Sequence, residues 1–316
     1  MKLITDIENL KLKNSIVTLG KFDGNHMGHQ LLFETAISLK QSDYCTVIFT
    51  FDVSPAKVVG KASNASRTIL THEERHFQQY KDGIDYVVEF PFNKQTMAMS
   101  PEDFVKEILV DKLDVKVIVV GEDFCFGKNR SGNVGTLKEL GKQYGFTVNA
   151  MKKVTYQPQD CDHPVEISST LIKEEILKGH LEDVNKMLGA PFTMVGEILQ
   201  GKKLGRTIGF PTINFDAPDE KILPPNGVYA TRTKIKGKLY DSITNVGNRP
   251  TFDDGEFRNV ETNIFDFDED AYGDRAEVMF YKFIRPERKF DSADDLMKEI
   301  KRNKEEAVNF FKELDK

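Results

Sequence analysis

The order of apolar runs over the first 180 residues constrains the fold of this chain more than any other feature. Short β-rich runs alternate with stretches of helical periodicity, beginning with SIVTLG (15–20) and GHQLLFETAISLK (28–40). Leu31, Leu32, Thr35 and Leu39 fall on one side of that expected helix. Further strands are expected at 45–51, 86–90, 116–121 and 146–151, with helices at 71–83, 100–113 and 134–144. This order predicts an α/β domain of Rossmann-like type, a parallel sheet covered by helices on both faces.

The pattern changes after GAPF (189–192). The runs TMVGEIL, GVYATRTKI, KLYDSITNVG, NVETNIFDF and AEVMFYKFI are β-type and are separated by turn residues. They predict an antiparallel β-barrel or sandwich. The stretch 292–314 closes the chain as one long helix, with Leu296, Ile300, Ala307 and Phe311 on its inner face. We therefore expect two domains, residues 1–186 and 187–316.

Composition and charge narrow the class of protein. The 316 residues are 39% hydrophobic and 30% charged, and no apolar run approaches the ~18–20 residues of a membrane helix. A net charge of −6 provides no general attraction to nucleic acid or anionic lipid. Cys45, Cys125 and Cys161 form no CxxC pair, and the N-terminus lacks the apolar core of a signal peptide. We expect a cytoplasmic protein that binds small molecules, neither nucleic acid nor a membrane, with self-association left open.

The stretch GKFDGNHMGH (20–29) joins the first strand to the first helix. Ligands of open α/β sheets bind at this end of the strands, and a helix start favours phosphate. Gly20 and Gly24 permit positive φ and close backbone approach, and Gly28 lies at the helix start. His26 and His29 are then donors to phosphate oxygens; the alternative is a glycine turn with solvated histidines. The strand–turn–helix context favours a site.

Three stretches of the first domain resemble the bacterial FAD synthetase branch of the nucleotidyltransferase superfamily. HMGH matches the HxGH signature, GEDFCFGKNRSG (121–132) resembles GxDFxFGxxRxG, and ISSTLIKEEILKG (167–179) resembles ISSTxIRxxLxxG. The resemblance implies a nucleotidyltransferase-type fold that transfers an adenylyl group from ATP to FMN and releases pyrophosphate, with His26 and His29 as catalytic residues. It also implies ATP phosphate contacts from Gly20, Phe22, Gly24, Gly28, Ser168, Ser169, Thr170 and Lys173.

The same resemblance implies where the flavin binds. Asp123, Phe124, Phe126 and Pro55 are its candidates, although Asp123 can equally shape its turn and the two phenylalanines can equally pack in the core. The chain departs from the family pattern at two places. Lys173 stands where the family usually has Arg, and Val53 and Ser54 replace Pro and His of the FxPHP turn. Lys keeps the charge but loses bidentate phosphate recognition, so we expect weakened adenylyl transfer.

The second domain carries GKKLGRTIGFPTIN (201–214), which lacks the GxxxxGK[ST] pattern of a Walker A loop. By itself the stretch also fits a basic β-hairpin. It resembles the riboflavin kinase pattern GxxxGRxxGFPTxN, which implies that Thr212 and Asn214 bind Mg²⁺ with the nucleotide phosphates. Hard oxygen ligands of this kind suit Mg²⁺. The implied phosphate-binding residues are Gly201, Lys202, Gly205, Arg206 and Gly209.

NVGNRPTF (245–252) and NVETNIFDFDEDAYG (259–273) also resemble the kinase. Glu261 matches the family's catalytic base, which takes a proton from the ribityl 5′-hydroxyl as that oxygen attacks the γ-phosphate. Asn263, where relatives often carry His or an aromatic residue, lies on the same strand face. Asp266 and Asp268 are expected to be turn or surface carboxylates.

Together the resemblances span about residues 15–311 and imply a bifunctional riboflavin kinase/FAD synthetase. Its substrates and products would be ATP, riboflavin, FMN and FAD, with Mg²⁺ as the metal. Two alternatives stay open: a relative that has lost one activity, and a flavin-binding regulator without turnover. Against the regulator stand Thr212, Asn214 and Glu261, which pure binding does not require.

Overall fold

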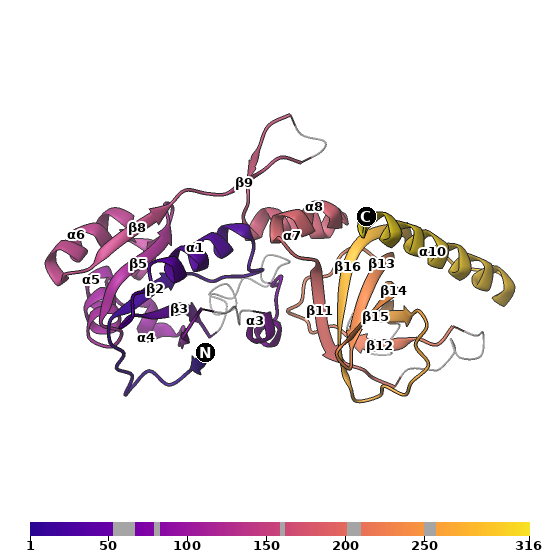
Figure 1. Ribbon diagram of the computed structural model, residues 1–316, viewed down its shortest axis with the longest axis horizontal. Coiled ribbons are helices and arrows are strands. Elements are labelled where there is room, and N and C mark those ends of the chain that lie inside the picture. The colour runs from indigo at the N-terminus through magenta and orange to yellow at the C-terminus, as the bar shows by residue number, and fades with distance from the viewer. Residues whose placement is uncertain (53–66, 79–82, 159–161, 201–209, 250–256) are drawn as a thin grey trace. The chain divides into compact units, whose positions relative to one another are not determined.

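The protein is described by a computed structural model that covers residues 1–52, 67–78, 83–158, 162–200, 210–249 and 257–316 (Figure 1). It divides into two units, one of residues 1–66 and 75–168 and the other of residues 67–74 and 169–316. The first unit contains a parallel sheet and the second an antiparallel barrel followed by a long helix, which confirms the predicted fold classes. The predicted boundary between the functional domains, at residues 186 and 187, stays a prediction.

Six parallel strands form the main sheet of the first unit, in the order β1-β4-β3-β2-β5-β8. They are β1 (Lys2–Ile4), β2 (Ser15–Leu19), β3 (Cys45–Phe51), β4 (Tyr86–Phe90), β5 (Val115–Gly121) and β8 (Thr147–Met151). All five residues of β2 are buried, and this strand pairs with β3 on one edge and β5 on the other. The chain reverses its direction of progress across the sheet at β2, so the end of β2 is the topological switch point.

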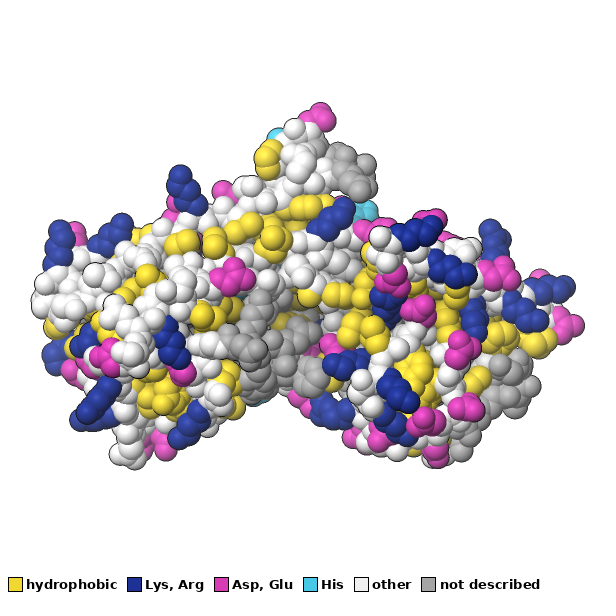
Figure 2. Space-filling view, in the orientation of Figure 1, with side chains coloured by type: hydrophobic (Ala, Val, Ile, Leu, Met, Phe, Trp, Pro, Cys, Tyr) yellow, Lys and Arg dark blue, Asp and Glu magenta, His cyan; other side chains and the backbone are white. Residues whose placement is uncertain are grey.

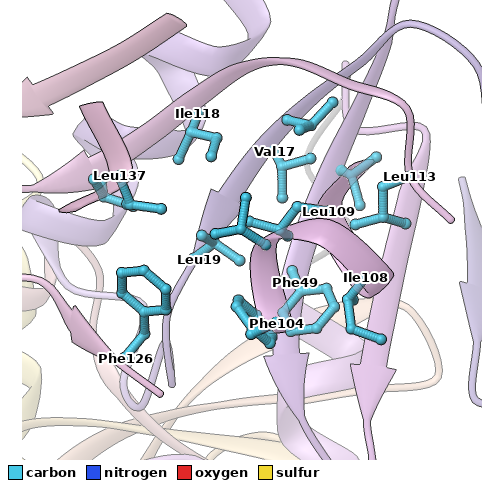
Figure 3. Packing of buried hydrophobic residues seen from close by; sticks show 14 of the residues in the cluster. Val17, Leu19, Phe49, Phe104, Ile108, Leu109, Leu113, Ile118, Phe126 and Leu137 are labelled. Atoms are coloured by element: carbon cyan, nitrogen blue, oxygen red, sulfur yellow. The ribbon is translucent and has the colours of Figure 1, made fainter. Parts of the chain in front are cut away.

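Helices cover both faces of this sheet (Figure 1). One face is covered by α1 (Met27–Ser38) and the other by the π-helical segment η2 (Phe104–Val110) and α6 (Val134–Tyr144). The short helices α4 (Lys94–Met97) and α5 (Pro101–Asp103) contain no buried residues. Alternation along β2 supplies both cores: Ile16 packs with α1, whereas Val17 and Leu19 pack with η2 and α6. Figure 3 shows the second core, where the rings of Phe49 and Phe104 meet with centroids 5.7 Å apart.

The buried side of α1 differs from the predicted one. Its buried residues are Leu32, Phe33 and Ala36, whereas Leu31, Thr35 and Leu39 are only partly buried. The cause is Phe22 in the preceding turn, whose fully buried ring lies 4.9 Å from that of Phe33 and sets the rotation of the helix. Leu39 also packs against this core although it is only partly buried, so the prediction from spacing was correct for Leu32 and Leu39.

Short elements complete the first unit. They are β6 (Cys125–Phe126), η3 (Lys128–Arg130), β7 (Gly132–Asn133), β9 (Thr155–Tyr156) and β10 (Val165–Glu166). Strands β6 and β7 pair as a hairpin directly after β5, and β9 pairs with β10. The helix α3 (His72–Gln78) contains residues of both units.

The second unit begins with α7 (Ser169–Lys178) and α8 (Leu181–Leu188) and continues into an antiparallel sheet of order β11-β16-β13-β14-β15-β12. Its strands are β11 (Phe192–Glu197), β12 (Ile213–Asp216), β13 (Gly227–Ile235), β14 (Lys238–Arg249), β15 (Phe257–Ile264) and β16 (Arg275–Pro286). The Leu199 amide donates to the Asn214 carbonyl at 2.9 Å and so links the two edges. This bond closes the sheet into a barrel.

The long helix α10 (Ala293–Leu314) covers one outer face of the barrel. Ala307 and Phe311 are buried against Val228 and Ala230 of β13, and Ile300 packs beside them. These contacts confirm most of the predicted inner face of the helix, since spacing at i, i+4 and i+7 places apolar residues on one stripe.

An ion pair with no solvent access joins residues 67–74 to the barrel. The side chains of Lys221 and Glu74 are 0% and 1% exposed, and Lys221 Nζ lies 2.6 Å from Glu74 Oε2. Lys221 also donates to the carbonyls of Ile69 and Thr193, and Glu74 Oε1 accepts from the Val195 amide at 2.9 Å. Buried charges are tolerated when paired and hydrogen-bonded in this way. The segment 67–74 is thus part of the second unit, although it follows β3 of the first in sequence.

We predict that Glu74→Ala lowers the free energy of unfolding of the second unit by about 3–5 kcal/mol, because it leaves the Lys221 ammonium buried without its partner. The neighbouring Glu73 provides a matched control: its ion pair with Arg275 joins side chains that are 62% and 52% exposed. Glu73→Ala is therefore expected to cost less than about 1 kcal/mol. Urea unfolding followed by far-ultraviolet circular dichroism measures both, and equal losses in the two variants would contradict this account.

Candidate active sites

The turn between β2 and α1 has an unusual backbone. Phe22 and Asn25 have φ values of 50° and 46°, and Gly24 has a φ of 90°. Positive φ is unfavourable for residues with a side chain, and such strain concentrates at functional sites. Gly20 does not have a positive φ, but a Cβ there would lie 2.8 Å from the Phe22 ring. Of the two glycines, Gly24 thus supplies the conformation and Gly20 supplies space.

The two histidines of this turn stack on each other. The rings of His26 and His29 are 3.6 Å apart between centroids with an interplanar angle of 21°, and the Phe22 ring meets His29 edge-on at 5.2 Å. A Cβ on Gly28 would lie 3.2 Å from the His26 ring, so this glycine leaves room for the stack. In the described part of the chain, the Nδ1 atoms of both histidines are buried without a hydrogen-bond partner. Such buried polar atoms are rare in folded proteins and indicate a place for a ligand.

Burial also sets the charge of the pair. Desolvation lowers the pKa of His26 to about 4, against a smaller opposing effect of Asp23, and it holds the pKa of His29 well below the ordinary value. Both imidazoles are therefore neutral at pH 7. Each offers one N–H donor and one acceptor nitrogen rather than a positive charge.

The candidate flavin residues lie in different environments. Phe126 is 8% exposed and belongs to the core of the first unit, and the Phe124 ring stacks on it with centroids 5.7 Å apart. Asp123 is exposed and lies 3.2 Å from Lys153 Nζ. Core packing accounts for the burial of Phe126, and the ion pair accounts for one oxygen of Asp123. Their contact with flavin stays a prediction.

The remaining phosphate candidates of the first domain lie around the start of α7, which begins at Ser169. Ser168 precedes it, and Thr170 and Lys173 lie in its first turns. The predicted sites at Pro55, Gly201, Lys202, Gly205, Arg206 and Gly209, together with the altered turn at Val53 and Ser54, lie outside the described residues. Their roles stay predictions.

In the barrel, strand register brings the candidate kinase residues together. Glu261 on β15 pairs directly with Asn214 on β12 and with Asn245 on β14. Directly paired residues present their side chains on the same face of a sheet with Cβ atoms about 5 Å apart. A carboxylate is thus flanked on both sides by amide side chains. Of these residues, sequence reasoning identified Glu261 and Asn214 and missed Asn245.

The barrel also contains a cavity of about 440 Å³, whose lining residues on β15 lie on the strand face opposite to Glu261. Pro211, Thr212, Ile213, Thr262, Ile264 and the segment 267–272 line it, together with Ile198. The Asn263 amide donates to the Pro211 carbonyl at 2.7 Å and so ties β15 to the cavity wall. Asp266 and Asp268 are exposed, which confirms their interpretation as turn or surface carboxylates, but the place of Asp268 in the cavity wall was not predicted. The alternation of acidic and aromatic residues in FDFDEDAY was the available signal.

Acidic and basic side chains are interspersed over the visible face of both units (Figure 2). Among the helices that the structure describes, none is long and apolar enough to cross a membrane.

The turn at the switch point of the parallel sheet and the row of Asn214, Glu261 and Asn245 in the antiparallel barrel are the two candidate sites, an arrangement expected of an enzyme that transfers phosphate groups. Two family models match the chain: FAD synthetase over residues 8–170 and riboflavin kinase over residues 188–311. The first match contains His26 and His29, and the second contains Asn214 and Glu261.

Relatives match over almost the whole chain. A bifunctional riboflavin kinase/FMN adenylyltransferase of Buchnera aphidicola is 35% identical, covering 98% of this chain and 99% of the relative. The enzyme of that name from Bacillus subtilis is 34% identical over 96% and 94%. A crystal structure titled as a macrolide-efflux protein from Streptococcus pneumoniae is 32% identical, with a TM-score of 0.84 and 98% of both chains covered. The chain belongs to the family of bifunctional riboflavin kinase/FMN adenylyltransferases.

The low pKa of His26 predicts a pH-dependent stability of the first unit. An unfolded imidazole binds its proton near pH 6.5, whereas the folded one does so near pH 4. The unfolded chain therefore holds the extra proton between these values, and stability is lost as the pH falls from about 6.5 to 4, by up to about 3 kcal/mol for this imidazole. Urea unfolding at pH 7 and pH 4.5 measures the loss. His26→Gln is the control and should show a smaller loss; an equal loss would contradict the prediction.

Proposed function

We propose that the barrel phosphorylates riboflavin to FMN and that the parallel-sheet unit adenylylates FMN to FAD, each at the site described above. Family membership gives the two activities, and what supports the assignment to residues is the register of β15. It holds Glu261 between Asn214 and Asn245 on one face of the sheet.

In the kinase reaction, Glu261 acts as general base. Its carboxylate takes the proton of the riboflavin 5′-hydroxyl while that oxygen attacks the γ-phosphorus of ATP, and the bond to the leaving ADP breaks. The partly buried position of Glu261 suits this role because strand register places the carboxylate between the uncharged side chains of Asn214 and Asn245. Most of the rate acceleration in phosphoryl transfer comes from such positioning.

Mg²⁺ fits the same site. Thr212 and Asn214 provide a hydroxyl and an amide oxygen, hard ligands of the kind that Mg²⁺ takes together with substrate phosphates. No cluster of three or more His, Cys, Asp or Glu that would hold a metal by itself occurs among the described residues. Bound there with ATP, the ion would offset phosphate charge during transfer.

In the adenylyl transfer, His26 and His29 bind the phosphates of ATP. A phosphate oxygen of FMN attacks the α-phosphorus in line, and the bond to pyrophosphate breaks. The neutral imidazoles donate N–H bonds, and the amides at the start of α1 add further donors at the positive end of the helix dipole. Transfer is direct, since no protein nucleophile is required.

The predicted boundary at residues 186 and 187 would separate the domain that transfers the adenylyl group from the domain that phosphorylates riboflavin. The cytoplasmic location, the absence of nucleic acid and membrane partners, and the open question of self-association stay predictions of the sequence.

The two sites can be tested separately. Glu261→Gln should lower FMN formation from riboflavin by about 10²–10⁴-fold because the base is lost, and it should leave FAD formation from supplied FMN intact. His29→Ala should do the reverse, with a loss of about 10²-fold or more in FAD formation. Incubation with riboflavin, ATP and Mg²⁺, followed by chromatography of FMN and FAD, measures both. Loss of both activities in either variant would contradict separate sites; neither product from the unaltered protein would favour a flavin-binding regulator.

Lys173 provides a test of the weakened adenylyl transfer. Lys173→Arg keeps the charge and restores a planar fork of donors, so we expect FAD formation from FMN to rise by about threefold to tenfold in kcat/KM. The rate of FMN formation should not change, which serves as the internal control. An unchanged or lower rate of FAD formation would show that lysine is adequate at this position.

A further inference from the structure

Asn259 lies two residues before Glu261 on β15 and therefore on the same face of the strand. Its Nδ2 atom donates a hydrogen bond to Glu261 Oε1 at 2.8 Å. The bond joins a neutral amide to a carboxylate, and hydrogen bonds to ionised groups are the stronger kind.

The oxygen of the Asn259 amide shows that this orientation of the side chain has an energetic cost. Within the described residues, Asn259 Oδ1 is buried and has no hydrogen-bond partner. Turning the amide over would place that oxygen against the Glu261 carboxylate, acceptor facing acceptor. The side chain thus keeps its donor on Glu261 while its own acceptor is left unsatisfied, an arrangement that folding alone does not favour.

Two neighbouring amides are bound elsewhere. Asn245 Nδ2 donates to Glu287 Oε1 at 3.2 Å, and Asn263 Nδ2 donates to the Pro211 carbonyl at 2.7 Å. Each lies close to Glu261, the first across the strand pair and the second two residues along β15. Among these three asparagines, the hydrogen bond to Glu261 comes from Asn259.

We propose that Asn259 is a positioning residue of the kinase reaction. It fixes Glu261 through Oε1 and leaves Oε2 to take the proton of the riboflavin 5′-hydroxyl. The inference rests on the proposed role of Glu261 as base. Asn259 acts through Glu261, so its removal changes the orientation of the base and leaves the ATP and riboflavin contacts in place.

The test compares Asn259→Ala with the isosteric Asn259→Asp. Both remove the donor, and the second also sets a carboxylate against Glu261. We expect kcat for FMN formation to fall roughly tenfold in the first variant, the typical weight of one hydrogen bond to a charged group, and further in the second. KM for riboflavin and ATP should stay unchanged, which shows that the site is assembled. Asn309→Asp, on the exposed face of α10, is the matched control and should keep the original kcat.

A double variant separates this inference from the proposed function. In a Glu261→Gln background, Asn259→Ala should cause no further loss of the residual rate, because there is no carboxylate left to orient. A further tenfold loss there would overturn the inference, and so would an unchanged kcat in both single Asn259 variants while Glu261→Gln is inactive. Full activity of Glu261→Gln would instead overturn the role of Glu261 as base.

Discussion

Both candidate sites depend on a strand that is hydrogen-bonded along both of its edges. In the first unit this is β2, between β3 and β5, and in the second it is β15, between β12 and β14. Side chains alternate strictly along a strand, so a shift of one residue would move every side chain to the opposite face. Pairing on two edges excludes that shift. This pairing therefore fixes where β2 ends and its turn begins, and on which face of β15 Glu261 lies.

Among the described residues, the centre of each candidate site consists of uncharged donors. The His26–His29 stack is held neutral by burial, and Glu261 pairs with Asn214 and Asn245 and accepts a hydrogen bond from Asn259. Neutral donors have a smaller desolvation cost than cations when they are buried. They also discriminate by direction, since a hydrogen bond weakens steeply when donor and acceptor are misaligned. Geometry therefore contributes more to recognition at these positions than net charge does.

The two fold classes could be predicted from the sequence, because the spacing of apolar residues in each segment is a local signal. The change of this pattern near residue 190 marks where the second fold class begins. The sequence was sufficient for the elements that carry His26, His29 and Glu261, since strand ends and strand faces follow from spacing, but the strand β12 that carries Asn214 was not predicted. The sequence was not sufficient for the buried face of α1, which depends on where the Phe22 ring lies. A residue in a left-handed turn before a helix does not reveal its contact partners through periodicity.

The same limit explains the missed pair Glu74 and Lys221. Each stands among charged residues, THEERH and DEKIL, and reads as part of a solvated surface. Each is buried only because the other is present, 147 positions away, with carbonyls and amides completing the hydrogen bonds. No local pattern carries such a pairing. Asn259 is a milder case: alternation placed it on the face of Glu261, but only its hydrogen bond separates a residue that orients the base from one that merely shares its strand. The buried ion pair and the hydrogen bond to the proposed base therefore both depend on contacts that form only in the folded chain.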